Sequence, residues 1–256
     1  MGAIFNELVY KPIYNLLIFT YDVLPFADFG IAIIILTIIV KFLLIPISRK
    51  QIESQKKMND LQPKIKELQN KYKNDKQKQS QALMQLYKEA KTNPFSGCLP
   101  LIVQLVFLIA IYRVLFNISN AGLIVEDAGL YAFVKNPGSI NPMFLGIINL
   151  SSVINLNQIA LRDAPQILLV VLAALSQFVQ TKMMMQKKQK NISEKSSNDI
   201  AQVMSKQMLF LGPLLTLFIG IKFPAGLSLY WLVSTLFMII QQYFIEKKTK
   251  SIVTNE

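Results

Sequence analysis

The sequence predicts an all-α integral membrane protein with five transmembrane helices, an N-terminal amphipathic helix and a cytoplasmic helical hairpin. Three observations predict this fold class. Apolar residues make up 52% of the 256 residues and charged residues only 16%, against about 25% charged in a typical soluble protein. Long apolar runs recur along the chain, and crossing about 30 Å of hydrocarbon takes about 20 helical residues. The basic residues gather in the segments between alternate runs.

The apolar runs place the five spans at about 29–47, 97–116, 165–184, 208–223 and 226–245. The fourth run, Leu209–Phe223, contains Pro213 and has only 15 residues, or about 23 Å of helix. We expect this helix to lie deep in protein, to thin the bilayer locally or to borrow flanking residues. The spans and their hairpin form a core at 29–246, followed by a short cytoplasmic tail at 247–256.

The distribution of Lys and Arg predicts the orientation. Of 27 such residues, 12 lie in 49–91, six in 182–206 and three in 247–250. Positive charge marks the cytoplasmic segments of membrane proteins, so we expect the N-terminus outside and the C-terminus in the cytoplasm. The net charge of +12 therefore reflects topology, and specific DNA binding is not expected. Because neither a cleavable signal nor a transit peptide is recognisable, the expected location is a bacterial plasma (inner) membrane, with several passes.

The N-terminal region, residues 1–28, predicts an extracytoplasmic amphipathic helix over 3–24. Apolar residues recur four apart, and polar residues share another face: Glu7, Lys11 and Asn15. Two interpretations are open at this point. The helix lies along the outer membrane surface, or it packs on the other spans.

The connecting segments differ in character. Residues of about 50–92 predict the cytoplasmic helical hairpin, with a break at Asn74-Asp75 and a second amphipathic stripe after it. Its first helix shows the 4-3-4 apolar spacing of a coiled-coil seam: Leu61, Ile65, Leu68 and Tyr72. Residues 117–164 carry few charges and many turn residues, which predicts an irregular outer segment, partly against the membrane surface.

Polar side chains within the apolar runs predict a hydrophilic groove. Lys41 shares a helix face with Thr37 and Ser48, because residues four and seven apart point the same way. A charge at membrane depth costs at least about 2.5–3.5 kcal/mol, so it calls for a reason. The other candidate lining residues are Gln104 on the second span, Ser176, Gln177 and Gln180 on the third, and Ser228, Trp231, Thr235 and Gln242, which share a face with Met238, on the fifth.

Structural interpretations compete with this groove. Lys41 lies about eight residues, or ~12 Å, from the predicted cytoplasmic edge, and its stem is long enough to snorkel part of that distance. Gln and Ser also tie neighbouring membrane helices together by hydrogen bonds. Tyr230 and Trp231 suit interfacial anchors. Residues four apart on the fourth span favour a close-packing face: Gly212, Thr216 and Gly220.

The sequence contains few residues or motifs that are typical of enzymes. With no histidine and the single cysteine Cys98, the chain lacks the commonest acid–base residue and a zinc ligand set. No Gly-rich loop ending in GKS or GKT is present, so use of ATP is not expected. We predict neither an enzyme nor a bound cofactor or metal.

Particular strings nevertheless resemble a known family. NPFSGCLPLIVQLVFLIAIYRVL at 93–115 and FPAGLSLYWLVSTLFMIIQQYFI at 223–245 are similar to the most characteristic blocks of the YidC/Oxa1/Alb3 membrane insertase family. LQPKIKELQNKYKND at 61–75 resembles its cytoplasmic hairpin, and QFVQTKMMMQ its third-span end. The resemblance implies a five-helix bundle that inserts and helps fold nascent membrane proteins without using ATP itself. Its groove would open to the cytoplasm and to lipid but not to the outside.

The resemblance also implies roles and partners. Lys41, in TIIVKFLLIPI, matches the basic residue that marks the groove, where relatives usually have arginine. Lysine keeps the charge but lacks the planar fork that holds a carboxylate in two places. The implied partners are nascent membrane proteins and membrane lipids, with the Sec translocon and the ribosome as further candidates. The chain resembles the short, Gram-positive-like form without a large external domain, and its tail is short for ribosome binding.

Two rival functions remain open from the sequence alone. The first is a small anion transporter or channel with a central lysine, which predicts symmetry-related broken helices and a path open on both sides. Neither feature is clear in the sequence. The second is a structural subunit of a larger membrane complex.

Overall fold

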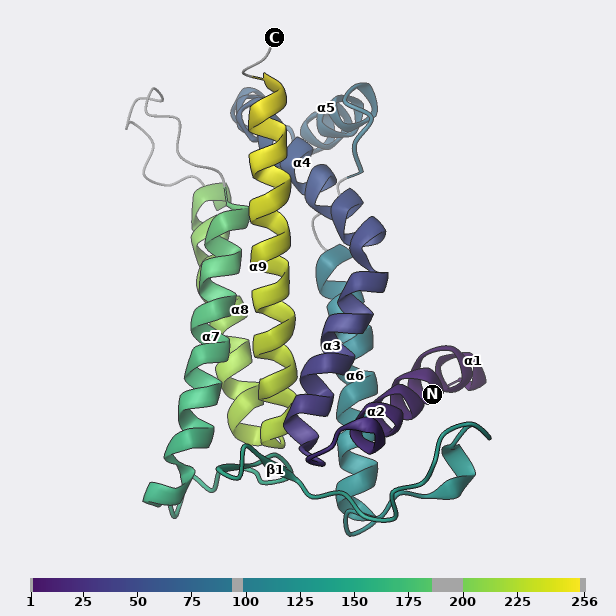
Figure 1. Ribbon diagram of the computed structural model, residues 1–256. Coiled ribbons are helices and arrows are strands. Elements are labelled where there is room, and N and C mark those ends of the chain that lie inside the picture. The colour runs from purple at the N-terminus through teal and green to yellow at the C-terminus, as the bar shows by residue number, and fades with distance from the viewer. Residues whose placement is uncertain (1, 94–98, 186–199, 254–256) are drawn as a thin grey trace.

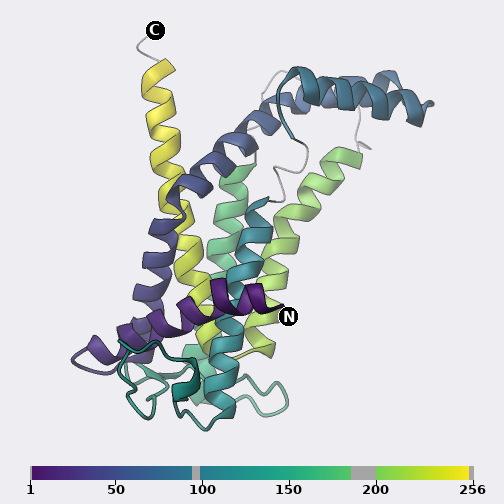
Figure 2. The same ribbon diagram turned by 90° about the vertical axis from the view of Figure 1, so that its right-hand side faces the viewer.

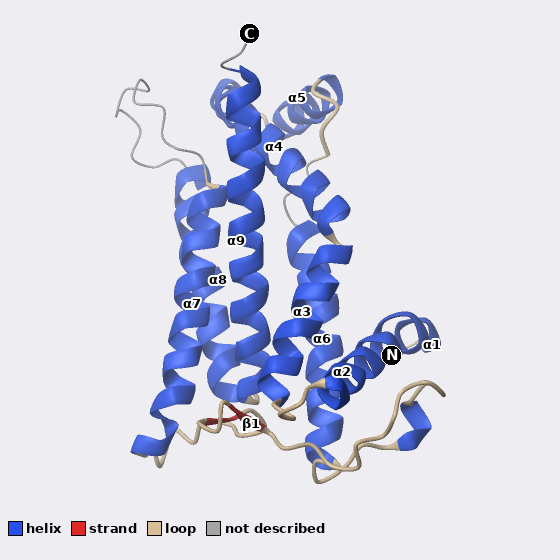
Figure 3. Cartoon of the chain, viewed as in Figure 1, coloured by secondary structure: helices blue, strands red, loops and turns tan. Residues whose placement is uncertain are grey.

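The computed structural model describes residues 2–93, 99–185 and 200–253, and almost all regular structure in them is helical (Figures 1 and 3). Cys98 and the first residues of the predicted second span lie outside the described residues. Five long helices run side by side in a bundle: α3 (Phe29–Leu43), α6 (Leu99–Asn120), α7 (Ala164–Met184), α8 (Ile200–Lys222) and α9 (Ala225–Val253). Helix α9 is central, because it packs against each of the other four.

Membrane-crossing capacity differs among these helices. Within the described residues, three stretches are long and apolar enough to cross a membrane individually: Ile102–Asn120, Leu161–Met184 and Ala225–Ile245. A fourth is obtained when α3 and the helix after it count as one bent span. The apolar part of α8, Leu209–Lys222, is shorter than a full span, as its sequence led us to expect. The fifth span therefore stays a prediction.

A sharp bend separates α3 from α4 (Ile45–Lys71). The two helices meet at 66°, with only Leu44 between them. Pro46 explains the break, because it has no N–H to donate to the carbonyl of Phe42 and its ring clashes with that carbonyl in a continuous helix. The first helix consequently ends at Leu43 rather than at residue 47, and the hairpin helix begins five residues before residue 50.

The bend changes the position of Lys41. The residue lies in the last turn of α3, not in the middle of a straight span. A cation is favoured there, because the C-terminal end of a helix carries partial negative charge. Ser48 lies beyond the bend, on α4, so the polar stripe predicted for a single helix is divided between two.

Helices α4 and α5 (Lys76–Glu89) form a hairpin that projects from one end of the bundle (Figure 2), here called the hairpin end. Asp75 begins α5 by accepting a hydrogen bond from the Lys78 N–H at 3.0 Å, as an N-cap residue does. Asn59 Nδ2 donates to the Met184 carbonyl at 2.7 Å. This contact ties α4 to the last turn of α7.

The N-terminal helical segment lies across the bundle (Figures 1 and 2). It comprises α1 (Ala3–Phe5), the π-helical turn η1 (Asn6–Tyr10) and α2 (Lys11–Val23). The wider turn ends two residues before Pro12, where an α-helical hydrogen bond to the Leu8 carbonyl is impossible. One face of α2 packs on the bundle and is buried: Ile13, Tyr14, Leu17, Ile18 and Tyr21. A second apolar face, which runs along the whole N-terminal helical segment from α1 to α2, is exposed: Ile4, Leu8, Phe19 and Val23.

The segment between α6 and α7, residues 121–163, covers the bundle end opposite the hairpin (Figure 1). It holds the short helices η3 (Asp127–Gly129) and η4 (Leu161–Asp163) and the antiparallel strands β1 (Met143–Phe144) and β2 (Ile148–Asn149). The carbonyls of Ser152 and Leu150 accept from the first N–H groups of α9, at 3.0 and 2.9 Å.

A second set of contacts joins this segment to α3. One Asp28 oxygen accepts from the Ile31 N–H at 3.0 Å and caps α3, and the other accepts from the Leu145 N–H at 2.7 Å. Phe144 packs directly on Gly30, where any Cβ would clash with its side chain. Apolar side chains of the segment are also buried against the bundle: Val125, Val134, Ile140 and Leu150. The chain itself thus closes this end of the bundle.

Candidate functional site

Lys41 lies at the meeting point of α3, α6 and α9. Its Nζ donates to Gln104 Oε1 at 3.1 Å and contacts Met238 Sδ at 3.5 Å. The same Gln104 oxygen accepts from Ser234 Oγ at 3.1 Å. Among the described residues no carboxylate lies within ion-pair distance of this ammonium. Lys41 is therefore held by neutral partners from two other helices.

A second polar cluster joins α7 to the adjacent side of α9. Trp231 Nε1 donates to Gln177 Oε1 at 3.0 Å, and Thr235 Oγ1 donates to the same oxygen at 3.4 Å. Gln180, one turn further along α7, donates from Nε2 to Met238 Sδ at 3.4 Å. Met238 thus connects the two clusters, because Lys41 and Gln180 both reach its sulfur.

Helix α9 therefore presents two polar faces, where the sequence suggested one. Trp231 and Thr235 face α7. Ser234 and Gln241 face α6 and α4, and Met238, at the border of the two faces, contacts both α3 and α7. Because residues three or four apart share a helix face, Ser234 and Gln241 form a stripe of their own with Met238.

A pocket lies on the hairpin side of Lys41. Its lining comes from α3, α4, α6, α9 and the bend: Lys41, Leu44, Ile47, Ser48, Gln51, Val103, Gln104, Met238 and Gln241. The cavity volume is about 20 Å³, enough for about one water molecule. The lining side chains therefore fill most of the space in which the sequence predicts a groove.

Four predicted groove residues belong to neither polar cluster. Two of them donate hydrogen bonds within their own helix, and the other two are buried at other positions on α9. Thr37 Oγ1 donates to the Ile33 carbonyl at 2.6 Å, and Ser176 Oγ donates to the Ala173 carbonyl at 2.7 Å. Ser228 is buried at the start of α9, and its hydroxyl has no hydrogen-bond partner among the described residues. Gln242 is also buried on α9, next to Gln241, which contacts Ile45 and Ser48 at the bend.

The structure adds Ser234, Gln241 and Gln51 to the site. All three are polar residues. Ser234 and Gln241 lie four residues before and three residues after Met238, and this helical spacing is a signal that the sequence contains. Gln51 is 5% exposed although it belongs to the polar hairpin helix. Its burial results from the bend, so the spacing of residues gave no indication of it.

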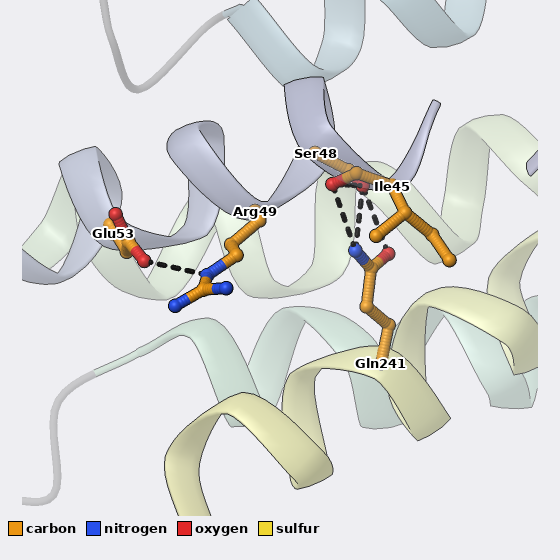
Figure 4. Close-up of polar contacts among 5 residues, drawn as sticks. All are labelled: Ile45, Ser48, Arg49, Glu53 and Gln241. Carbon is orange, nitrogen blue, oxygen red and sulfur yellow. Dashed lines mark hydrogen bonds and ion pairs between the residues drawn. The ribbon is translucent and has the colours of Figure 1, made fainter. Parts of the chain in front are cut away.

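Ser48 is hydrogen-bonded to Gln241 of α9 just after the bend (Figure 4). Gln241 Nε2 donates to Ser48 Oγ at 2.7 Å and to the Ile45 carbonyl at 3.5 Å, and Gln241 Oε1 accepts from Ser48 Oγ at 3.0 Å. The neighbouring Arg49–Glu53 pair, at 3.0 Å, is exposed. One side chain of α9 therefore holds the first turn of α4.

Replacing Gln241 by leucine is expected to loosen the first turns of α4. Losing one partly buried hydrogen-bonded contact costs about 1 kcal/mol, so amide hydrogen exchange there should accelerate about fivefold. The control is Arg49→Ala, which removes only an exposed ion pair worth about 0–1 kcal/mol. Equal exchange rates in α4 for both variants would show that Gln241 does not hold the bend.

Comparisons with known proteins agree with the geometry. A profile of the family described as 60Kd inner membrane protein matches residues 19–252. A membrane protein insertase YidC from Fusobacterium nucleatum is 36% identical over 222 residues, covering 86% of this chain and 87% of that protein. A membrane protein insertase YidC from Rickettsia typhi is 32% identical over 244 residues, covering 94% of this chain. The chain spans only 39% of the length of that relative.

A solved structure shows the same fold. It is described as an active YidC insertase crystal structure with the first transmembrane domain resolved. The TM-score is 0.57 at 24% sequence identity, and the similarity covers 93% of this chain and 46% of the other.

Proposed function

The chain belongs to the 60Kd inner membrane protein family, and from that premise we propose that it is a membrane protein insertase of a bacterial plasma membrane. Five spans would cross the membrane, with the N-terminus outside and the hairpin end in the cytoplasm. The exposed apolar face of the N-terminal helix would contact the outer membrane surface. Helix α8, whose apolar part is short, would thin the bilayer locally and shorten the path for a substrate.

One observation carries the proposal: a lysine whose partners among the described residues are all neutral lies beside a pocket at the hairpin end of the bundle. Such an ammonium attracts an acidic substrate flank more strongly than in bulk water, because the effective dielectric constant near protein is lower. The opposite end is closed by the segment between α6 and α7. With the hairpin end in the cytoplasm, as we propose, the site would be reached from the cytoplasm alone, which would suit insertion better than passage through a channel.

The substrate would then divide between two environments. Its polar flank would enter beside Lys41, where the amides of Gln104, Gln177 and Gln180 replace lost contacts with water. Its apolar helix would leave sideways into lipid past α3, α7 and α9, driven by the transfer of apolar surface out of water. The basic hairpin would receive nascent chains or ribosomal RNA, or bind anionic lipid headgroups. The Sec translocon is a further candidate partner.

Reconstitution tests the proposal directly. Purified protein in liposomes should insert a single-span substrate with a short acidic N-terminal flank, measured as protease protection of that flank. Protein-free liposomes give the background. Release of trapped anions without substrate protection would favour the transporter. No protection and no release would favour the structural subunit.

A further inference from the structure

Two hydrogen-bond donors from different helices converge on one sulfur atom. Lys41 Nζ reaches Met238 Sδ at 3.5 Å from α3, and Gln180 Nε2 reaches it at 3.4 Å from α7. A thioether is a weak acceptor, and an ammonium commonly bonds to a carboxylate or carbonyl oxygen, at about 2.7–2.9 Å when the acceptor is charged. Lys41 therefore has one good acceptor, Gln104 Oε1 at 3.1 Å, and one weak acceptor, the sulfur of Met238.

A further donor lines the pocket beside Lys41 and Met238 and has no partner among the described residues. Gln51 is 5% exposed, and its Nε2 makes no hydrogen bond among the described residues. It lines the pocket together with Lys41, Gln104 and Met238. A buried donor left unpaired costs about 1–3 kcal/mol. The pocket thus has more donors than good acceptors, which is the chemistry of a site for an anion or a carbonyl oxygen.

Met238 is the lining residue best able to make room. Its side chain is half-buried, unbranched and rotatable about three bonds, so it changes position at low cost. When the thioether leaves, the position between Lys41 and Gln180 becomes free for an oxygen. The cavity of about 20 Å³ is too small for a carboxylate until that happens.

We propose that Met238 is a displaceable placeholder, and that its thioether occupies the position taken by a carboxylate oxygen of the substrate flank. The incoming carboxylate would accept hydrogen bonds from Lys41 and Gln180, and Gln51 would contribute a third. Met238 then determines specificity, because an acidic flank gains enough to displace it and a neutral flank gains less. This inference rests on the proposed insertase function.

A matched pair of variants tests the placeholder. Met238→Glu would put a carboxylate of the chain's own in the position, and Met238→Gln has the same length without the charge. For a single-span substrate with Asp in its flank, insertion by Met238→Glu should be at least tenfold lower than by Met238→Gln. With Asn in place of that Asp, the two variants should differ by less than about threefold. Equal insertion of the Asp substrate by both variants would overturn the proposal.

A binding measurement separates this inference from the insertase function itself. A dye-labelled single-span peptide with the Asp flank is titrated onto each variant in nanodiscs. Selective weakening by Met238→Glu, at least tenfold for the Asp peptide and not for the Asn peptide, supports the placeholder even if no variant inserts a substrate. Met238→Leu keeps the volume, but the branched side chain has fewer rotatable bonds and leaves the position less easily, so it should bind the Asp peptide about threefold more weakly than the unchanged protein. Unchanged binding by a folded Met238→Leu would contradict displacement.

Discussion

Replacing Lys41 by glutamate is expected to abolish insertion of a substrate with an acidic flank. Two unit charges 4 Å apart interact by about 4 kcal/mol at an effective dielectric constant of 20, and the substitution turns attraction into repulsion. A loss well above tenfold follows, since 1.4 kcal/mol corresponds to a factor of ten. Lys41→Ala should be intermediate, because it removes attraction without adding repulsion. The measurement is insertion in a depletion strain that relies on the variant.

Two further variants, Lys41→Arg and Lys222→Glu, serve as controls. Lys41→Arg should retain insertion, because it keeps the charge and adds donors for a carboxylate. Lys222→Glu makes the same charge change at the exposed end of α8 and should have little effect. If Lys41→Glu, Lys41→Ala and Lys41→Arg all insert the acidic substrate as well as the unchanged protein, the Lys41 mechanism is wrong.

The second large effect is expected at Gly220, where α8 packs closely against α7 and α9. A Cβ there would lie 2.7 Å from Val170 Cγ1 and 2.9 Å from Ser228 Oγ. Overpacking of this kind typically costs about 1–3 kcal/mol, and the better helix propensity of alanine returns up to about 1 kcal/mol. Gly220→Ala should therefore lower the free energy of unfolding in detergent by up to about 2 kcal/mol.

Gly212→Ala is the matched control, because it makes the same change eight residues earlier in the same helix. Its Cβ would meet nothing closer than 3.6 Å, an ordinary contact, so only the gain in helix propensity remains. This variant should be as stable as the unchanged protein or slightly more stable. If the two alanine variants unfold alike, α8 and α7 do not pack as closely at Gly220 as the structure shows.

Local signals in the sequence account for much of the fold. Asn74-Asp75 predicts the turn between α4 and α5. The first span is predicted to continue to residue 47, across Pro46, although a proline interrupts a helix. The 66° angle at Leu44 was not predictable, because it depends on how α4 packs at the hairpin end. The positions of Ser48 and Gln51 depend on that angle, which is why Ser48 was assigned to the wrong helix face and Gln51 was missed.

Some residues of the candidate site could likewise be predicted from the sequence, and others could not. Lys41, Gln104, Gln177 and Trp231 attract notice because polar side chains are rare in apolar runs, and the structure brings each into a polar contact. Periodicity places residues on a face of α9 but does not say which helix covers that face. Met238 carries no polarity that would mark it as a partner of Lys41. Its place was decided by the packing of three helices.

The bend at Leu44 has a mechanical consequence. Helix α4 has 27 residues, or about 40 Å at 1.5 Å rise per residue, and it joins α3 through one residue instead of a flexible linker. A rotation of ~10° about that joint would sweep the far tip of α4 through ~7 Å on such a lever arm. Small movements beside Lys41 would thus appear magnified at the tip, where a spectroscopic distance probe could record them.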